Sequence, residues 1–332
     1  MSGDYLWDFS GPRDPETVRL ERLLRPLGQQ TPAPFKFPEP APRRRTSSTA
    51  FVVSLLAAAA SIAVLVGFTW LNRSNTTPGW QVTRVSGAPK VGARAIDLQA
   101  ELKVGHWLET PADSRASIAI ANIGQVEVDP HTRLGLVSAA PGDYRLRLAR
   151  GTMHALIWSP PGQFFVETPN STAVDLGCAY TMTVDDGGVG IVRVTSGWVG
   201  FEWRGREAFI PAGAIDVTRP GYGPGTPHYE DTSQAFQDAL VTIDLEGGSA
   251  ADRANALTRV LGEARARDTV SLWHLLTRVD PSERGRVFDR LASFVTPPQG
   301  VTREGVLSGD RHMRDQWWDA LGLGTASWWR TW

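Results

Sequence analysis

The side chains that could carry out chemistry are few and scattered along this 332-residue chain. The histidines show no HExxH or HxH spacing, so they do not form the ligand set of a catalytic zinc site. A single cysteine, Cys178, excludes an internal disulfide framework and any zinc site of the CxxC type. The histidines belong to different predicted elements, at His106, His131, His154, His228, His274 and His312. We therefore expect no metal site.

The common catalytic motifs are also missing from the sequence. It has no GxxxxGK[ST] phosphate-binding loop, no GxSxG nucleophile elbow and no SxxK nucleophile. Its acidic pairs fit solvent-facing strands and a turn better than acid–base pairs, and none has the alternating ligands of an EF-hand. These pairs are Glu101 with Glu109, Glu127 with Asp129, and Asp185 with Asp186. We predict that the chain is not an enzyme and holds no cofactor.

Cys178 lies within ETPNSTAVDLGCAYTMTV, which covers residues 167–184. A reactive thiol needs an electropositive neighbourhood, and the nearest charged residue in this segment is Asp175. We therefore interpret Cys178 as a small buried apolar residue in a strand. Gly177, just before it, is expected to supply a backbone conformation that a side chain would forbid.

An apolar segment divides the chain at residues 51–71, FVVSLLAAAASIAVLVGFTWL, which contain no charge. At about 1.5 Å per residue, such a helix crosses the roughly 30 Å hydrocarbon core of a bilayer. Arg43, Arg44 and Arg45 precede it, whereas Arg73 stands alone after it, so the positive-inside rule places the N-terminus in the cytoplasm. Its distance from Met1 and the absence of small residues at its end argue against a cleaved signal peptide. We predict a single-pass protein of the bacterial inner membrane, with its C-terminal domains periplasmic or otherwise extracytoplasmic.

The predicted cytoplasmic arm, residues 1–45, combines a short amphipathic helix with a proline-rich tether. Asp14 and Pro15 suit the N-cap and first position of that helix. Its apolar stripe has no partner within the arm, so we expect it to bind a cytoplasmic protein or to lie on the inner membrane face. The candidate partner-binding residues are Trp7, Leu20, Leu23, Leu24 and Leu27.

The hydrophobic period changes after the apolar segment. Over residues 79–220, apolar and polar residues alternate in short runs, such as Ala116, Ile118 and Ile120, separated by turn residues. This pattern predicts an all-β sandwich or a flattened solenoid of short strands. Over residues 229–332 the spacing becomes helical and predicts a C-terminal domain of five or six helices, as a small bundle or a repeat-like stack.

Tryptophans gather at the end of the chain, at Trp317, Trp318, Trp328, Trp329 and Trp332. The favoured interpretation is that they pack the last helices onto the β domain. The alternative is an aromatic surface that binds a glycan or a partner protein, because tryptophan is enriched among the residues that contribute most of the binding free energy of an interface. Trp328 and Trp329 are the candidate ligand- or partner-binding residues of that surface.

The most specific pattern within residues 80–215 is a V-x-T-P turn followed by a V-x-G-T-x-F-x-V-like strand. The residues that carry this pattern and the small and apolar positions around it include Leu102, Val104, Gly105, Leu108, Thr110, Ala116, Ile118, Gly124, Val126, Val128, Val166, Thr168, Pro169, Val174, Gly177 and Met182. In these positions the region resembles the FecR domain, the extracytoplasmic domain of transmembrane regulators that control sigma factors. Cys178 stands where the family usually has threonine, and Tyr180 where it has phenylalanine.

The resemblance implies a cytoplasmic anti-sigma segment, one transmembrane helix and an extracytoplasmic β domain, in the order that the hydropathy pattern also predicts. Two departures are present: the arm is shorter than a helical anti-sigma domain, and the C-terminal region is helical instead of mixed α/β. The net charge of −1 favours no nucleic acid partner. The sequence thus leaves two hypotheses, a membrane-anchored regulator that contacts a sigma factor or other cytoplasmic regulator, and an extracytoplasmic scaffold for cell-wall glycan or an envelope protein.

Overall fold

The computed structural model describes residues 15, 18, 19, 79–245 and 248–324. Residues Met1–Asn72 and Arg73–Trp332 form two separate compact units. The predicted membrane span at residues 51–71, the arm residues Trp7, Leu20, Leu23, Leu24 and Leu27, and the tail residues Trp328 and Trp329 lie outside the described residues. Within the described part of the arm, Pro15, Val18 and Arg19 have helical backbone. No helix in the described ranges has both the length and the apolar character needed to cross a membrane.

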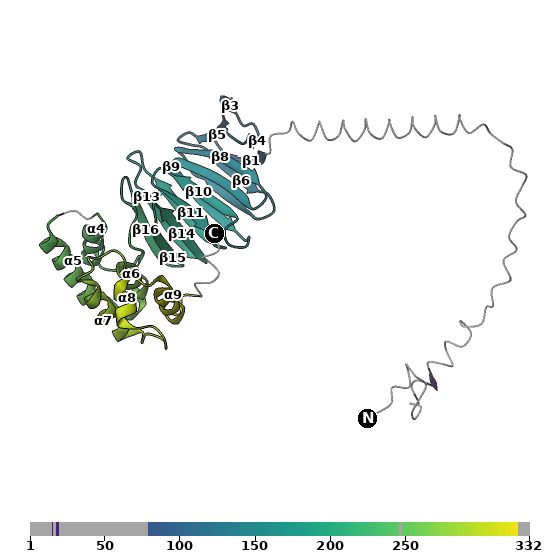
Figure 1. Ribbon diagram of the computed structural model, residues 1–332. Helices are drawn as coiled ribbons and strands as arrows, with labels where there is room; N and C mark the ends of the chain where they lie inside the picture. Colours follow the sequence, from purple (N-terminus) through teal and green to yellow (C-terminus); the bar gives the residue numbers. More distant parts are fainter. Residues whose placement is uncertain (1–14, 16–17, 20–78, 246–247, 325–332) are drawn as a thin grey trace, which may run out of the picture. The chain divides into compact units, whose positions relative to one another are not determined.

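The second unit begins with a large β structure made of two hydrogen-bonded sheets (Figure 1). One sheet, here sheet A, contains β1 (Gly79–Ser86), β4 (Gln99–Lys103), β6 (Arg115–Ile120), β7 (Gly124–Val128), β12 (Ala179–Val184), β13 (Gly190–Ser196), β16 (Ala214–Arg219), β17 (Gly223–Pro224) and β18 (His228–Tyr229). The other, sheet B, contains β2 (Lys90–Val91), β3 (Arg94–Ala95), β5 (Trp107–Thr110), β8 (Thr132–Ala140), β10 (Phe164–Thr168), β11 (Ser171–Asp175), β14 (Trp198–Trp203) and β15 (Arg206–Pro211). The predicted mainly β region is therefore confirmed as a two-sheet structure.

One long strand, β9 (Asp143–Ile157), belongs to both sheets. Its first half pairs with β8 and, in parallel, with β10 in sheet B. Its second half pairs with β7 and β12 in sheet A. The change occurs at Gly151, whose φ is 92°, a left-handed conformation that glycine adopts without steric cost. A side chain at Gly151 would also overlap Thr132.

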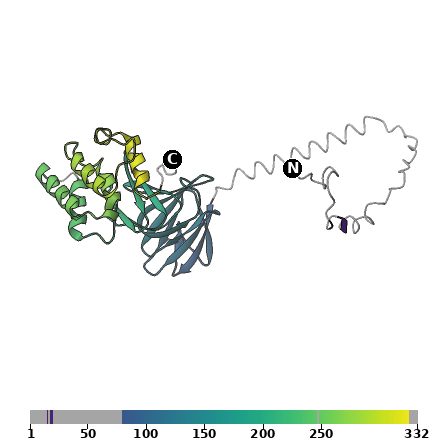
Figure 2. The same cartoon turned by 90° about the horizontal axis from the view of Figure 1, so that it is seen from below.

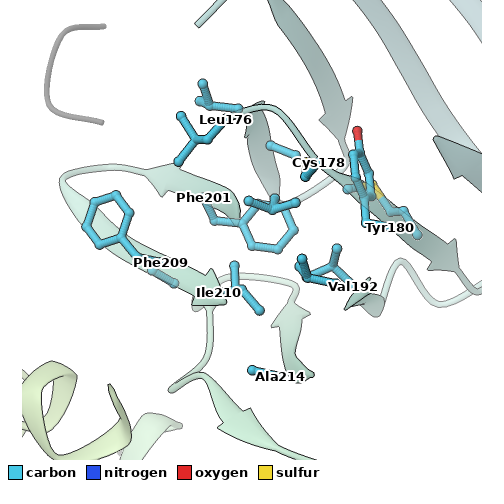
Figure 3. Packing of buried hydrophobic residues seen from close by; sticks show 14 of the residues in the cluster. Leu176, Cys178, Tyr180, Val192, Phe201, Phe209, Ile210 and Ala214 are labelled. Atoms are coloured by element: carbon cyan, nitrogen blue, oxygen red, sulfur yellow. The ribbon is translucent and has the colours of Figure 1, made fainter. Parts of the chain in front are cut away.

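The core between the sheets follows the predicted alternation of apolar and polar residues. In β6, Ala116, Ile118 and Ile120 are at most 1% exposed. Figure 3 shows Cys178, Phe201 and Val192 among the clustered side chains. The turn predicted at Asp185 and Asp186 connects a hairpin, since β12 and β13 are antiparallel and their connection begins at Asp185.

The helical part packs at the end of the sheets formed by β13, β15 and β16 (Figures 1 and 2). It contains α4 (Gln234–Asp244), α5 (Ala250–Glu263), η2 (Ala266–Asp268), α6 (Thr269–Leu275), α7 (Arg284–Phe294), α8 (Arg303–Ser308) and α9 (Arg311–Ala320). Helix α4 begins at the N-cap Ser233, whose side chain accepts a hydrogen bond from the Phe236 amide, and α5 begins with a capping box of Ser249 and Asp252. The predicted C-terminal helical part is confirmed.

Residues of the sheets and of the helices share one hydrophobic core. Trp317 and Trp318 in α9 are fully buried. Trp318 packs against Trp198 and Phe209 of sheet B, with ring centroids 5.6 and 5.9 Å apart, and against Trp273 of α6 at 4.8 Å. For these two tryptophans, the structure agrees with the interpretation that aromatic residues pack the last helices onto the β region.

Candidate ligand-binding site at the junction of the sheets and the helices

The junction between the two parts contains a buried carboxylate, Asp244, at the C-terminal end of α4. Its Oδ1 accepts hydrogen bonds from Arg206 Nη2 at 2.6 Å, Thr226 Oγ1 at 2.7 Å and Arg278 Nη1 at 3.2 Å. Its Oδ2 accepts one from the Thr226 amide at 2.6 Å. A carboxylate at a helix C-terminus opposes the helix dipole, so the two guanidinium groups offset both that repulsion and the cost of burial.

Arg278 is the most deeply buried cation of this site, with its side chain only 4% exposed. It follows α6 and also donates to Thr226 Oγ1 at 3.0 Å and to the backbone carbonyl of Glu207 at 2.7 Å. Burial lowers the pKa of Arg278, and the neighbouring Asp244 carboxylate opposes that shift. One side chain thereby joins β15 to α4 and to the segment before β18.

Arg206 begins β15 and contributes the second cation. Its Nε donates to the carbonyl of Pro224 at 2.8 Å, while Nη2 binds Asp244. The tight turn before it consists of Arg204 and Gly205, because Trp203 and Arg206 are paired residues of β14 and β15. The φ angles of these turn residues are 48° and 79°.

A pocket of about 360 Å³ opens beside this turn, and arginine side chains make up much of its lining. Trp273 and His274 of α6 form another part of its wall. The guanidinium of Arg314 lies 5.4 Å from the centroid of the Trp273 ring. The arginines that line the pocket are Arg204, Arg206, Arg278 and Arg314, and Glu207 is the acidic residue among them.

His274 adds no positive charge to this pocket. Its Nδ1 donates to the Val270 carbonyl at 2.7 Å, because a carbonyl can only accept, and its Nε2 accepts from the Phe209 amide at 3.0 Å. Both nitrogens of a neutral imidazole are thereby used. Burial, and then the nearby Arg278, lower the pKa of His274 well below its usual value.

A second pocket, of about 210 Å³, is lined by Asp244 and by other residues of β16 and α4. Asp216 in β16 is fully buried, and burial raises its pKa to about 7. Within the described ranges its Oδ2 has no hydrogen-bond partner, and the same is true of His228 Nε2. His228 Nδ1 donates to the Thr226 carbonyl at 3.1 Å, so Nε2 is an acceptor in the neutral ring.

The junction is therefore equipped for binding. It presents guanidinium donors toward one pocket and carboxylate and imidazole acceptors toward the other. Neither pocket contains a residue that our sequence analysis singled out as a binding residue. The single available signal was the Arg204–Gly205 pair between two alternating runs. The residues that line the arginine-rich pocket are up to 110 positions apart in the sequence, from Arg204 to Arg314.

Cys178 is buried, as predicted, with 2% exposure. It lies one residue before β12 and not within a strand, and its environment is less apolar than we expected. Its Sγ donates to Asp175 Oδ2 at 2.8 Å, and the Gly177 amide donates to Oδ1 at 2.7 Å. Burial raises the pKa of Asp175 to about 7 and that of the Cys178 thiol far above its usual range. Gly177 has a φ of 83°, which confirms its predicted role.

Among the other candidate side chains, Glu101 and Glu109 lie on exposed strand faces, and Asp186 lies in an exposed turn. Glu109 pairs with Arg133 at 3.3 Å. His154 in β9 lies between Asp129, 2.9 Å from Nε2, and Thr181, 2.8 Å from Nδ1. The contacts of His154 connect β9 with β12 and with Asp129, which directly follows β7. Across residues 79–245 and 248–324, no group of three or more His, Cys, Asp or Glu side chains is placed to hold a metal ion.

No family model matches the chain, and no curated protein shows significant sequence similarity to it. Two crystal structures of a provisionally assigned anti-sigma factor from Parabacteroides distasonis ATCC 8503 are similar in part, each at 14% identity with a TM-score of 0.34. The 1.65 Å structure matches over 47% of this chain and 74% of its own length, and the 2.50 Å structure over 46% and 73%. These similarities assign the chain to no family.

Proposed function

We propose that the chain is a single-pass membrane regulator of the FecR-like type, which transmits an envelope signal to a cytoplasmic sigma factor or other regulator by protein–protein contact. The observation that carries the proposal is the order of segments. An uncharged run at residues 51–71, preceded by Arg43, Arg44 and Arg45, leads into a compact unit whose first strand begins at Gly79. The proposal includes no catalytic step.

In this proposal, the apolar stripe of the arm is the surface that contacts the cytoplasmic partner. Leu20, Leu23, Leu24 and Leu27 share one face of the predicted helix and have no apolar partner in residues 1–45. A helix of this length is marginal alone in water, so we propose that it gains stability by docking on its target. The pockets around Asp244 would belong to the extracytoplasmic end.

Topology can be tested by thiol labelling, because the native Cys178 is buried and its thiol resists ionisation. New cysteines are introduced as Ser2→Cys in the arm and Asp186→Cys in the β12–β13 turn, where the native side chain is 87% exposed. In cells with a permeabilised outer membrane, a membrane-impermeant maleimide should label Asp186→Cys, and should label Ser2→Cys only after lysis. Labelling of Ser2→Cys before lysis would refute the proposed orientation.

The partner can be tested by crosslinking in cells from a photoreactive residue at Trp7. We expect a sigma factor or a transcription regulator, and we expect Leu23→Glu with Leu24→Glu to abolish the crosslink. A matched pair of changes in the proline-rich tether, Gln29→Glu with Gln30→Glu, should leave it intact. If neither class of protein is recovered, the regulator proposal fails at its cytoplasmic end.

A second candidate function is an extracytoplasmic scaffold that holds cell-wall glycan or an envelope protein. One described feature favours it: Trp158 and Leu156, at the end of β9, are 60% and 46% exposed. Exposed aromatic and aliphatic side chains in one place are typical of binding surfaces. If Trp158→Ala with Leu156→Ser abolishes retention on peptidoglycan or on a single envelope protein, this function is supported; unchanged retention would remove the surface from consideration.

A further inference from the structure

We propose that the arginine-lined pocket beside the β14–β15 turn binds an oxyanion, carried as a phosphate or carboxylate group on a small ligand. This proposal goes beyond the regulator function and does not depend on membrane topology. It rests on the conformation of the turn, on the guanidinium groups that remain available, and on the charge and size of the pocket.

The turn holds Arg204 in a conformation that arginine rarely adopts. A two-residue hairpin loop with positive φ at both positions is a type I′ turn, for which Asn-Gly is the preferred sequence. Arg204 occupies the asparagine position with a φ of 48°, and Gly205 follows at 79°. Non-glycine residues pay a steric cost there, and such strain concentrates at functional sites. In this conformation Arg204 forms part of the lining of the pocket.

Two guanidinium groups keep donors for a ligand. Arg204 makes no hydrogen bond or ion pair to any residue in the described ranges, and its guanidinium carbon lies 4.6 Å from the centroid of the Trp203 ring. Arg206 uses Nε for Pro224 and Nη2 for Asp244, which leaves Nη1 without a hydrogen-bond partner in the described part of the chain. The Arg206 side chain is 22% exposed, so this nitrogen is accessible in part.

Positive charge is in excess around the pocket. Arg206 and Arg278 share a single ion-paired carboxylate, Asp244, and Arg204 is paired with no carboxylate in the described ranges. Glu207 is paired with Arg311 at 2.9 Å. An anion that enters the pocket would therefore reduce repulsion among the arginines as well as gain hydrogen bonds.

The geometry selects oxyanions over other anions. Guanidinium groups present paired N–H donors whose spacing matches two oxygens of a carboxylate or a phosphate. The pocket volume of about 360 Å³ exceeds that of a bare ion and leaves space for the remainder of a small molecule against Trp273. Phosphate and carboxylate ligands share this chemistry, and the experiment below separates them.

The test measures thermal unfolding of the full-length protein in detergent with inorganic phosphate, with citrate, or with sodium chloride at matched ionic strength. We expect saturable stabilisation by phosphate or by citrate and none by chloride. Stabilisation by phosphate alone assigns a phosphate ligand, and stabilisation by citrate alone assigns a carboxylate. The absence of any anion-specific stabilisation would overturn the proposal.

The decisive variant is Arg204→Asn. Asparagine suits a positive φ better than arginine does, so the turn and the fold should be kept or stabilised. Loss of a charged donor should nevertheless weaken the apparent anion affinity about tenfold or more. The control Arg150→Asn changes an exposed arginine of β9 that pairs with Asp186 outside the pocket and should leave the affinity unchanged. Equal affinity in Arg204→Asn and wild type would overturn the proposal.

Discussion

Two buried carboxylates in this molecule are stabilised in different ways. Asp175, between the sheets, is 1% exposed and accepts hydrogen bonds from the Gly177 amide and the Cys178 thiol, with no cationic side chain paired to it among the described residues. Asp244, at the junction of the sheets and the helices, is 5% exposed and is bound by Arg206, Arg278 and Thr226.

The difference shows where this protein tolerates buried charge. Burial raises the pKa of Asp175 to about 7, so the interior of the sandwich favours its neutral form. The junction instead brings cations to the carboxylate from two different elements. Because the junction keeps charged side chains in its interior, these side chains can also interact with a charged ligand. The interior of the sandwich instead consists mainly of packed apolar side chains.

The largest loss of stability is expected from Asp244→Asn. Removal of the shared carboxylate leaves Arg278 buried without an ion pair, which typically costs about 3–5 kcal/mol of unfolding free energy. Urea denaturation followed by tryptophan fluorescence would measure the loss. The exposed ion pair of Arg150 and Asp186 provides the control, since Asp186→Asn should change stability very little. Equal stability in the two variants would mean that the junction does not depend on its ion pairs.

The second-largest effect is expected in the way the unfolding free energy of Asp175→Asn depends on pH. Burial raises the pKa of Asp175 to about 7 in the folded protein, from 3.8 for an ordinary aspartate carboxyl, so the folded state binds more protons than the unfolded state between these pH values. Its contribution to stability is therefore complete below about pH 4 and is lost as the pH rises through 7. Relative to wild type, the asparagine variant should gain stability with rising pH, by up to about 4 kcal/mol at pH 8.

The measurement for this variant is the difference between the unfolding free energies of the variant and of wild type from pH 4 to pH 8. The difference removes the contributions of other titrating groups, including Asp216, whose pKa is also raised to about 7. A variant that instead loses stability relative to wild type as the pH rises would show that Asp175 is charged and paired.

The smallest effect is expected from Cys178→Ala. The change removes a buried sulfur and the thiol donor to Asp175, at a cost of about 1–2 kcal/mol. In wild type, the native thiol should react with a disulfide reagent only as fast as the protein unfolds, because burial raises its pKa. Rapid labelling of the native protein would contradict the packing around Asp175 and Cys178, and Cys178→Ser would show whether a hydroxyl donor restores stability.

The sequence predicted the strand-rich and helical parts because their hydrophobic periods are local. The alternation of Ala116, Ile118 and Ile120 places all three in the core, and Ser249 with Asp252 marks the start of α5. Within the predicted helical region, α5 ends at Glu263, because Ala264 leaves the helical conformation before η2 begins.

The junction site could not be predicted in the same way. Arg204, Arg206, Asp244 and Arg278 come from the β14–β15 hairpin, α4 and the segment after α6, so only the tertiary fold brings them together. Arginine is also so common in this chain that an isolated residue carried no signal. The positive φ of Arg204 is a property of the folded turn, which composition does not reveal.

The shared strand β9 has a consequence for biosynthesis. Its first half needs β10, and its second half needs β12, to complete the two sheets. A nascent chain that has emerged only as far as Ile157 therefore presents two unpaired edges at once, one in each sheet, and exposed edges of this kind recruit other chains. Both edges become protected only after residues 164–184 have followed, so any delay in translation between these points would favour aggregation over folding.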